Sequence, residues 1–166
     1  MQTIITKFVE DVFKEHGGFT TPIVDVGGAE TQGQFKHLFS YEIWDKRNLP
    51  DVDRVIDITE PLERSAINYA AVLICVDTLE HIWEFQKAIK NLGRIVKQGG
   101  VLVITVPFAF PFHDISSDFW RFSSLALDRL FLEDFARLDS GFYGEDIRIG
   151  SWGAAHTNSF FIGRRR

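Results

Sequence analysis

The sequence contains only one cysteine, Cys75, among its 166 residues. A single cysteine cannot form an intrachain disulfide, and it cannot supply the several thiolates of a structural zinc site. No apolar run approaches the roughly 20 residues that a membrane helix needs. The net charge of −5 disfavours broad electrostatic binding to nucleic acid. We therefore expect a cytoplasmic protein that acts on neither membranes nor nucleic acids.

Histidines are also few and widely spaced. The sequence has five, which are His16, His37, His81, His113 and His156. No two of them stand three or four residues apart, and the zinc-binding segment His-Glu-x-x-His is absent. On this spacing argument we expect no metal site.

What the chain does have is a globular composition, with 45% hydrophobic and 25% charged residues. Its length suits one domain spanning residues 1–166, because single cores commonly serve about 100–200 residues. Apolar residues recur at three- and four-residue spacing between positions 4 and 13, which predicts an N-terminal helix that ends near the glycines at 17 and 18. We expect this helix, within residues 1–18, to cover the core.

Short apolar segments then alternate with segments of helical periodicity. The predicted strands are residues 23–26, 41–45, 54–58, 70–77 and 101–106. The predicted helices are residues 31–39, 79–97 and 123–133, the last with Ser123 as its N-cap. Further strands are expected at 136–142, 146–149 and 158–162. This alternation predicts an α/β fold in which a parallel sheet carries helices on both faces and ends in consecutive strands.

The turn after the first predicted strand contains Gly27 and Gly28, which either permit close approach of a ligand to the backbone or simply form a tight turn. The dinucleotide pattern G-x-G-x-x-G is not met, because its later glycines are replaced by Ala29 and Gln32. A nicotinamide-dependent oxidoreductase is therefore disfavoured.

Each of the first four predicted strands carries an aspartate at or near its end: Asp25, Asp45, Asp57 and Asp77. Ligands of parallel sheets bind at this edge, where an acid such as Asp45 can accept both hydroxyls of a ribose. The alternative is a surface acid beside Lys46 and Arg47. A row of acids suits a cationic ligand better than a phosphate, and a sulfonium nucleoside is such a ligand.

These residues resemble the class I S-adenosylmethionine-dependent methyltransferases, in particular the type 11 branch. The resemblance covers about residues 23–132. Residues 25–31, DVGGAET, are similar to the family motif D-x-G-x-G-x-G, with alanine and threonine in place of the later glycines. Asp45 and Asp57 match two further acids, and residues 73–82 and 93–107 match the segments around the fourth and fifth strands. The most specific match is residues 106–123, VPFAFPFHDISSDFWRFS.

The resemblance implies a Rossmann-like three-layer sandwich with a mostly parallel seven-stranded sheet and a closing antiparallel strand. It implies a cofactor-binding core at residues 22–135 and C-terminal strands at 136–166. The implied cofactor is S-adenosylmethionine, and the implied reaction is SN2 transfer of its sulfonium methyl group to a small-molecule or sugar acceptor. The implied cofactor-binding residues are Asp25, Gly27, Gly28, Ala29, Asp45, Lys46, Asp57, Ile58, Val76 and Asp77.

For the acceptor side, the resemblance implies that His113 is the catalytic base and that Phe108, Trp120 and Arg121 bind the substrate. Two alternatives stay open. His113 can instead be a structural hydrogen-bonding residue, and Arg121 can instead pair with Asp118 or Asp114 to hold its own loop. Because the glycine motif is altered, the chain can also be a catalytically silent methyltransferase-fold module, acting as a partner subunit or a homodimer.

Overall fold

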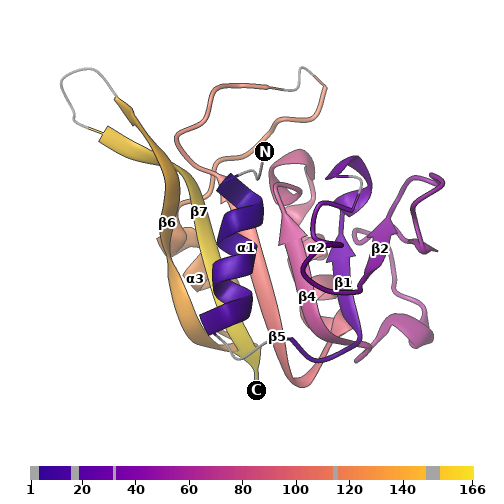
Figure 1. The fold of residues 1–166 in the computed structure, drawn as a ribbon. Coiled ribbons are helices and arrows are strands. Elements are labelled where there is room, and N and C mark those ends of the chain that lie inside the picture. Colours follow the sequence, from indigo (N-terminus) through magenta and orange to yellow (C-terminus); the bar gives the residue numbers. More distant parts are fainter. Residues whose placement is uncertain (1–3, 16–18, 32, 114–115, 149–153) are drawn as a thin grey trace.

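The computed structural model describes residues 4–15, 19–31, 33–113, 116–148 and 154–166. One seven-stranded sheet, in the order β3-β2-β1-β4-β5-β7-β6, forms the centre of the molecule (Figure 1). Its strands are β1 (Ile23–Val26), β2 (Glu42–Asp45), β3 (Arg54–Val55), β4 (Ala70–Val76), β5 (Val96–Pro107), β6 (Phe135–Arg148) and β7 (Ala154–Arg165).

Strands β1 to β5 pair in parallel, whereas β7 runs antiparallel to both of its neighbours, β5 and β6. The prediction of a mostly parallel sheet with a closing antiparallel strand is therefore confirmed. The carboxyl ends of β1 and β4 lie at the top of Figure 1, and the segment after β5 arches over this edge.

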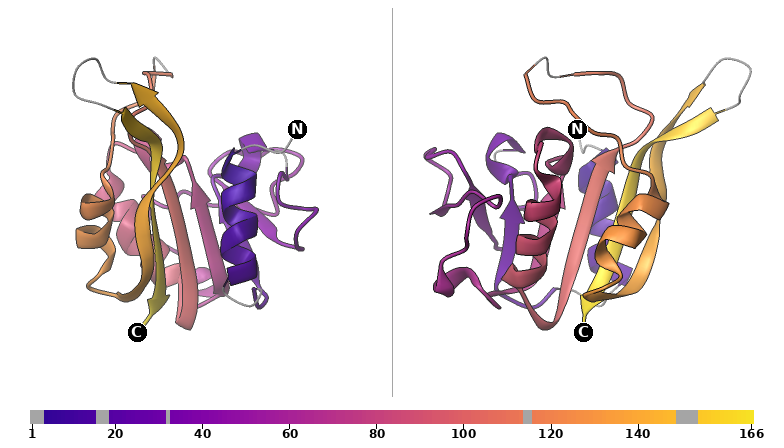
Figure 2. Two further views of the ribbon diagram at one scale, coloured as in Figure 1. Left: turned by 60° about the vertical axis from the view of Figure 1, so that its left-hand side comes forward. Right: turned by 180° about the vertical axis from the view of Figure 1, so that it is seen from behind.

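Helix α1 (Ile4–Glu15) lies on one face of the sheet, and helices α2 (Phe85–Ile95) and α3 (Ser124–Phe131) lie on the other (Figure 2). Side chains of β4 alternate between two buried clusters. Leu73 packs in the cluster that contains Leu92 of α2, and Ile74 packs in the cluster that contains Val9 of α1. Because both faces are covered, β4 is a continuous apolar run rather than an alternating one. None of the helices in the described ranges has the length and apolar composition needed to span a bilayer.

Two sequence predictions about the crossovers are wrong. The predicted helix at 31–39 is a short 3-10 helix, η1 (Gly28–Thr31), followed by turns. The predicted helix at 79–97 is divided into a 3-10 turn, η3 (Leu79–His81), and α2. The spacing of apolar residues along the sequence could not locate these helix boundaries, because a short helix forms only where tertiary packing supports it.

Strand boundaries also differ from the predictions. Strand β3 ends at Val55 rather than at residue 58, and β5 begins at Val96. The glycines at 99 and 100 do not end the helix. They lie in an irregularity within β5, where one residue of β4, Ala71, stands opposite residues 97–100 of β5 and Gly99 has a φ of +73°. The predicted strands at 136–142 and 146–149 are one strand, β6.

One of the two predicted helix ends can be compared with the structure. The Ser123 hydroxyl accepts a hydrogen bond from the Ala126 backbone N–H at 3.2 Å, which confirms it as the N-cap of α3. The predicted glycine stop of α1 at 17–18 lies outside the described residues.

Candidate functional site

A cavity of about 740 Å³ lies at the carboxyl ends of β1, β2 and β4. The order of the strands reverses here. From β1 the chain continues to β2 and β3 on one side of the sheet, and then returns to β4 on the other side of β1. This switch point is where α/β sheets bind their ligands. Its lining residues are Val26, Gly27, Trp44, Asp45, Lys46, Arg47, Asp57, Ile58, Thr59, Asp77, Thr78, His81, Ile82, Trp83, Glu84, His113 and Ser117.

Asp45 ends β2 with its carboxylate almost fully buried, at 4% exposure. Both oxygens accept hydrogen bonds from the Arg47 guanidinium, each at 3.0 Å, and Oδ1 also accepts from the Arg47 backbone N–H at 2.9 Å. Burial alone would raise the pKa of Asp45, but these bonds and one from the Ala29 backbone outweigh it and hold the pKa below its usual value. Asp45 is therefore ionised, and both of its carboxylate oxygens are bound by Arg47 of the same chain.

Gly27 connects β1 to the cavity in a conformation that favours glycine. Its φ is +82°, and a Cβ atom here would lie only 2.6 Å from Cγ2 of Thr78 in the loop after β4. Its N–H donates to the Trp44 carbonyl at 2.8 Å. The glycine therefore lets the loops after β1, β2 and β4 meet at the cavity floor.

Asp25 lies beneath the cavity rather than in it. A Cβ atom on Gly28 would lie 2.5 Å from Cγ of Asp25, so Gly28 makes room for this carboxyl group. Asp25 is 2% exposed, and its Oδ2 has no hydrogen-bond partner among the described residues. Burial, and then the charge of Asp45, raise its pKa to about 7.

Two further aspartates line the cavity. Asp77, just beyond β4, has a φ of +43°, which is uncommon for a residue with a side chain. Its Oδ1 accepts hydrogen bonds from Thr105 at 3.2 Å and Asn158 at 3.3 Å, but burial prevails and raises its pKa. Asp57 is exposed and accepts bonds from the N–H and hydroxyl of Thr59.

Histidines form the opposite side of the cavity. His81 ends η3 and His113 comes from the loop after β5, yet their Nε2 atoms lie 3.3 Å apart. Glu80 beside them is completely buried, and neither carboxylate oxygen has a hydrogen-bond partner among the described residues. Burial raises the pKa of Glu80 to about 9.

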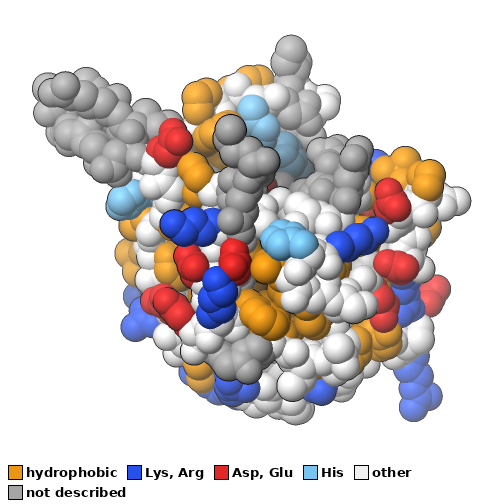
Figure 3. Space-filling model, in the orientation of Figure 1, with side chains coloured by type: hydrophobic (Ala, Val, Ile, Leu, Met, Phe, Trp, Pro, Cys, Tyr) orange, Lys and Arg blue, Asp and Glu red, His pale blue; other side chains and the backbone are white. Residues whose placement is uncertain are grey.

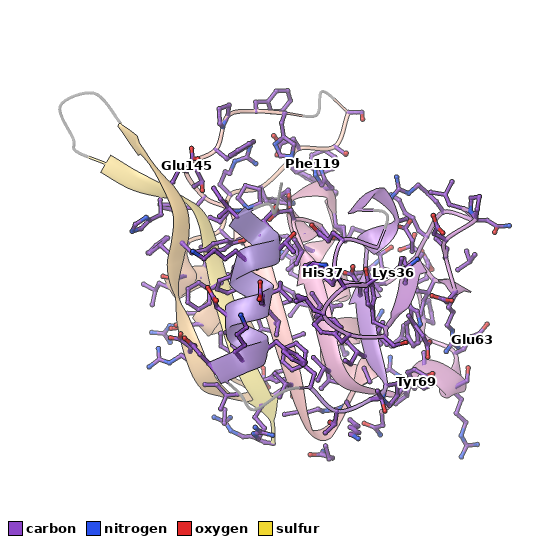
Figure 4. The ribbon with its side chains drawn as sticks, viewed as in Figure 1. Lys36, His37, Glu63, Tyr69, Phe119 and Glu145 are labelled. Atoms are coloured by element: carbon purple, nitrogen blue, oxygen red, sulfur yellow. The ribbon has the colours of Figure 1, made fainter. Side chains whose placement is uncertain are left out.

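The loop at residues 108–123 is tied to η3 by its backbone. The Glu80 carbonyl accepts from the N–H groups of Phe119 at 2.9 Å and Trp120 at 3.3 Å, and the Trp120 indole donates to the Ile82 carbonyl at 3.0 Å. On the face seen in Figure 3, hydrophobic and histidine side chains gather at the top, where this loop runs in Figure 1. Phe119 lies on the same loop near the top of Figure 4.

Asp118 and Arg121 hold this loop in shape. The guanidinium binds both Asp118 oxygens and also donates to three loop carbonyls, of Phe110, Pro111 and Trp120. Hydrogen bonds from Arg121, more than its charge, lower the pKa of Asp118. This geometry favours the structural alternative for Arg121, because its donors are engaged within the loop.

The structure brings half of the predicted site residues to the cavity lining. Gly27, Asp45, Lys46, Asp57, Ile58, Asp77 and His113 line the cavity. Predicted residues outside the lining are Asp25, Gly28, Ala29, Val76, Phe108, Trp120 and Arg121. Trp120 stacks on Trp83 with ring centroids 5.2 Å apart, and Phe108 packs on Phe142 at 4.8 Å. Trp120 therefore supports the lining residue Trp83 from outside the cavity, whereas Phe108 packs against β6.

Sequence reasoning missed ten of the lining residues, among them Arg47, Thr78, His81, Trp83 and Ser117. Arg47 and Thr78 each follow a predicted strand end by one or two positions, so a wider window there would have found them. His81 and Ser117 gave no comparable signal, because their positions depend on how the loop docks on η3.

Comparison with known proteins gives similarity in structure alone. No protein-family model matches the sequence, and no curated protein matches it. The YcgJ protein of Bacillus subtilis has a TM-score of 0.68 at 12% identity, with 97% of each chain covered. The 1,6-didemethyltoxoflavin-N1-methyltransferase of Burkholderia thailandensis, crystallised with 1,6-didemethyltoxoflavin and S-adenosylhomocysteine, has a TM-score of 0.63 at 13% identity, over 96% of this chain and 77% of that one.

A third similar structure is the methyltransferase bound to the Trm112 methyltransferase activator of Haloferax volcanii. Its TM-score is 0.63 at 12% identity, with 97% of this chain and 93% of that chain covered. These similarities, together with the strand order and the cavity at its switch point, show that the chain has the fold of the class I S-adenosylmethionine-dependent methyltransferases.

Proposed function

We propose that the protein is an S-adenosylmethionine-dependent methyltransferase that acts on a small-molecule or sugar acceptor. The observation that carries the proposal is the buried, ionised carboxylate of Asp45 at the end of β2, facing a cavity at the switch point of a methyltransferase fold. A carboxylate in this place suits the two hydroxyls of a ribose.

The other residues of the cavity fit this cofactor. A volume of about 740 Å³ falls within the range of roughly 300–1,000 Å³ that cofactor sites span. Ile58 supplies apolar surface for a base, and Asp57 stands beside it to accept polar hydrogens. Aspartates without a neighbouring phosphate-binding loop favour a cationic ligand, and the Burkholderia neighbour binds the demethylated form of this cofactor.

S-adenosylmethionine, when bound, supplies a methyl group that is already activated on a positively charged sulfur. The task left to the chain is to align an acceptor with this methyl group and to exclude water. The 108–123 loop closes the cavity edge, and its Asp118–Arg121 pair keeps it in place. His113 stays our prediction for the base, with its Nδ1 oriented by Asp118 Oδ2 at 3.1 Å.

One feature favours the catalytically silent alternative. Arg47 covers both oxygens of Asp45, so a ribose must displace at least part of that ion pair before it can bind. If the pair does not open, the fold serves as a binding module or a partner subunit. The Haloferax neighbour is a methyltransferase in complex with an activator protein, which makes a partner worth seeking in that case.

The test is calorimetric titration with S-adenosylmethionine and S-adenosylhomocysteine in the presence of a chelator. We expect micromolar binding, about −8 kcal/mol, that weakens at least tenfold in Asp45→Ala. Asp51→Ala, which removes an exposed acid outside the cavity lining, is the matched control and should bind like the wild type. Absence of heat with both ligands in folded wild-type protein would reject the enzyme and favour the silent module.

A further inference from the structure

The two histidines of the cavity face each other through atoms that both carry lone pairs. His81 Nδ1 lies 3.0 Å from the Ser117 carbonyl oxygen, and His113 Nδ1 lies 3.1 Å from Asp118 Oδ2. A carbonyl and a carboxylate only accept hydrogen bonds, so each Nδ1 carries the hydrogen. In neutral rings each Nε2 is then an acceptor, and the two acceptors lie 3.3 Å apart. Two acceptor nitrogens at this distance can share either a proton or a metal ion.

A buried carboxylate completes the cluster. Glu80 is fully buried, and within the described residues neither of its oxygens has a hydrogen-bond partner. Its Oε1 lies 3.6 Å from Nε2 of His81, and one ligand atom from each of Glu80, His81 and His113 lies within 4.8 Å of the others. A cation in this place would give the buried Glu80 carboxyl group a partner and stabilise its ionised form.

We infer that Glu80, His81 and His113 bind a divalent transition-metal ion of the zinc class. Zinc binds histidine nitrogen at about 2.0–2.1 Å in tetrahedral geometry, which requires neighbouring nitrogens to lie roughly 3.3 Å apart. The two Nε2 atoms have this separation. The Glu80 carboxylate would have to move closer to the two nitrogens to complete a set of two histidines and one carboxylate, which is a known catalytic zinc set.

The surroundings of the cluster are those of a metal site. Ligand histidines commonly donate their other N–H to a carbonyl or a carboxylate, which fixes the ring and makes the ligand nitrogen more basic. Ser117 and Asp118 do this for His81 and His113. Arg121 in turn donates a hydrogen bond to Asp118, which fixes the carboxylate that orients His113.

The position of the site deepens the proposed function, and this step rests on that function. His81 and His113 both line the cavity, so an ion between them has open coordination positions on the cavity side. An acceptor hydroxyl bound there loses its proton to solvent more readily, because the ion stabilises the oxyanion. A C–O bond then forms at the methyl carbon as the C–S bond of the cofactor breaks. With the ion bound, His113 is a metal ligand and the ion takes over the activation of the acceptor that we otherwise assign to His113 as base, since both roles use the Nε2 lone pair.

The experiment is a titration of chelator-treated protein with Co²⁺, followed by visible absorption, and then displacement by Zn²⁺. We expect one Co²⁺ per chain with the absorption of a tetrahedral or five-coordinate site, and loss of the signal when Zn²⁺ is added. His113→Ala and Glu80→Gln should each weaken binding by a factor of 100 or more. His37→Ala is the control, because His37 is exposed on the turn after β1, away from the loop that carries Phe119 (Figure 4).

Two results would overturn the site. One is a wild-type protein that shows no such absorption, which means that the histidines share a proton instead. The other is unchanged affinity in both His113→Ala and His81→Ala, which means that the ion binds elsewhere. Far-UV circular dichroism in chelator checks that each variant is folded. Since these titrations contain no S-adenosylmethionine, and the cofactor titration contains a chelator, failure of either proposal is visible without the other.

Discussion

The cavity has two walls that differ in how they are built. The strand-end wall consists of Val26, Gly27, Asp45, Asp57 and Asp77, each at or just beyond the end of a parallel strand. The histidine wall consists of His81, His113 and Ser117, which meet only because the 108–123 loop docks on η3. In the strand-end wall the main acid, Asp45, is paired within its own chain. Beside the histidine wall, the buried carboxyl group of Glu80 has no hydrogen-bond partner among the described residues.

This difference shows what each wall is prepared to bind. The strand-end wall must exchange an internal ion pair for a ligand, so its affinity depends on how easily Arg47 leaves Asp45. At the histidine wall, the metal ion that we propose would instead give the buried Glu80 carboxyl group a partner. Three substitutions, taken from the largest expected effect to the smallest, test this contrast.

Gly27→Ala should destabilise the loops that form the strand-end wall. An L residue at a φ of +82° costs roughly 1–2 kcal/mol, and overlap of the new Cβ with Thr78 adds a similar amount, so we expect the free energy of unfolding to fall by about 3 kcal/mol. Gly99→Ala is the matched control, since its φ is +73° but no atom lies within 4 Å of the new Cβ. Urea denaturation should show a loss of only about 1 kcal/mol there. Equal losses would mean that contact with Thr78 is unimportant.

Asp118→Asn should loosen the histidine wall. The amide keeps the shape but loses charge-assisted hydrogen bonds to Arg121 and His113, so we expect the protein to lose about 1.5 kcal/mol of stability at neutral pH. Because the folded-state pKa of Asp118 lies below its usual 3.8, its contribution is present above that pH and is lost as the pH falls through the folded-state value. Unfolding curves of wild type and variant should therefore converge in acid, whereas Asp51→Asn should match the wild type throughout. A difference in unfolding free energy between wild type and Asp118→Asn that stays the same at all pH values would contradict this account.

Arg47→Ala should show whether its ion pair with Asp45 opposes cofactor binding. Without the ion pair, both carboxylate oxygens are open to a ribose, and we expect affinity for S-adenosylhomocysteine to rise about threefold to tenfold, or ~1 kcal/mol. Arg47→Lys keeps the charge but not the paired contact. Calorimetry should therefore give it an affinity for S-adenosylhomocysteine between those of the wild type and Arg47→Ala. Weaker binding in Arg47→Ala would show instead that this guanidinium holds the cofactor.

Much of the strand-end wall could be predicted from the sequence, for a local reason. A buried parallel strand is a short apolar run, and the residue after it lies at the ligand-binding edge, so Gly27, Asp45 and Asp57 were identified by position alone. Asp25 and Gly28 were misplaced because the same rule cannot tell a side chain that faces the cavity from one buried beneath it.

The histidine wall could not be predicted in this way. His81 and His113 are separated by 32 positions, and the spacing argument that led us to expect no metal considers only pairs on one helix. Their approach depends on backbone bonds from Phe119 and Trp120 to Glu80, and such bonds have no signature in residue type.

By itself the sequence determined the alternation of buried strands and helices, the N-cap at Ser123 and the row of aspartates, because each follows from local apolar pattern or local hydrogen bonding. Tertiary structure decided that Arg47 closes on Asp45, that Arg121 holds its own loop, and that two distant histidines meet over Glu80. These contacts join segments whose separation is set by packing, and packing depends on the whole chain rather than on any short stretch of it.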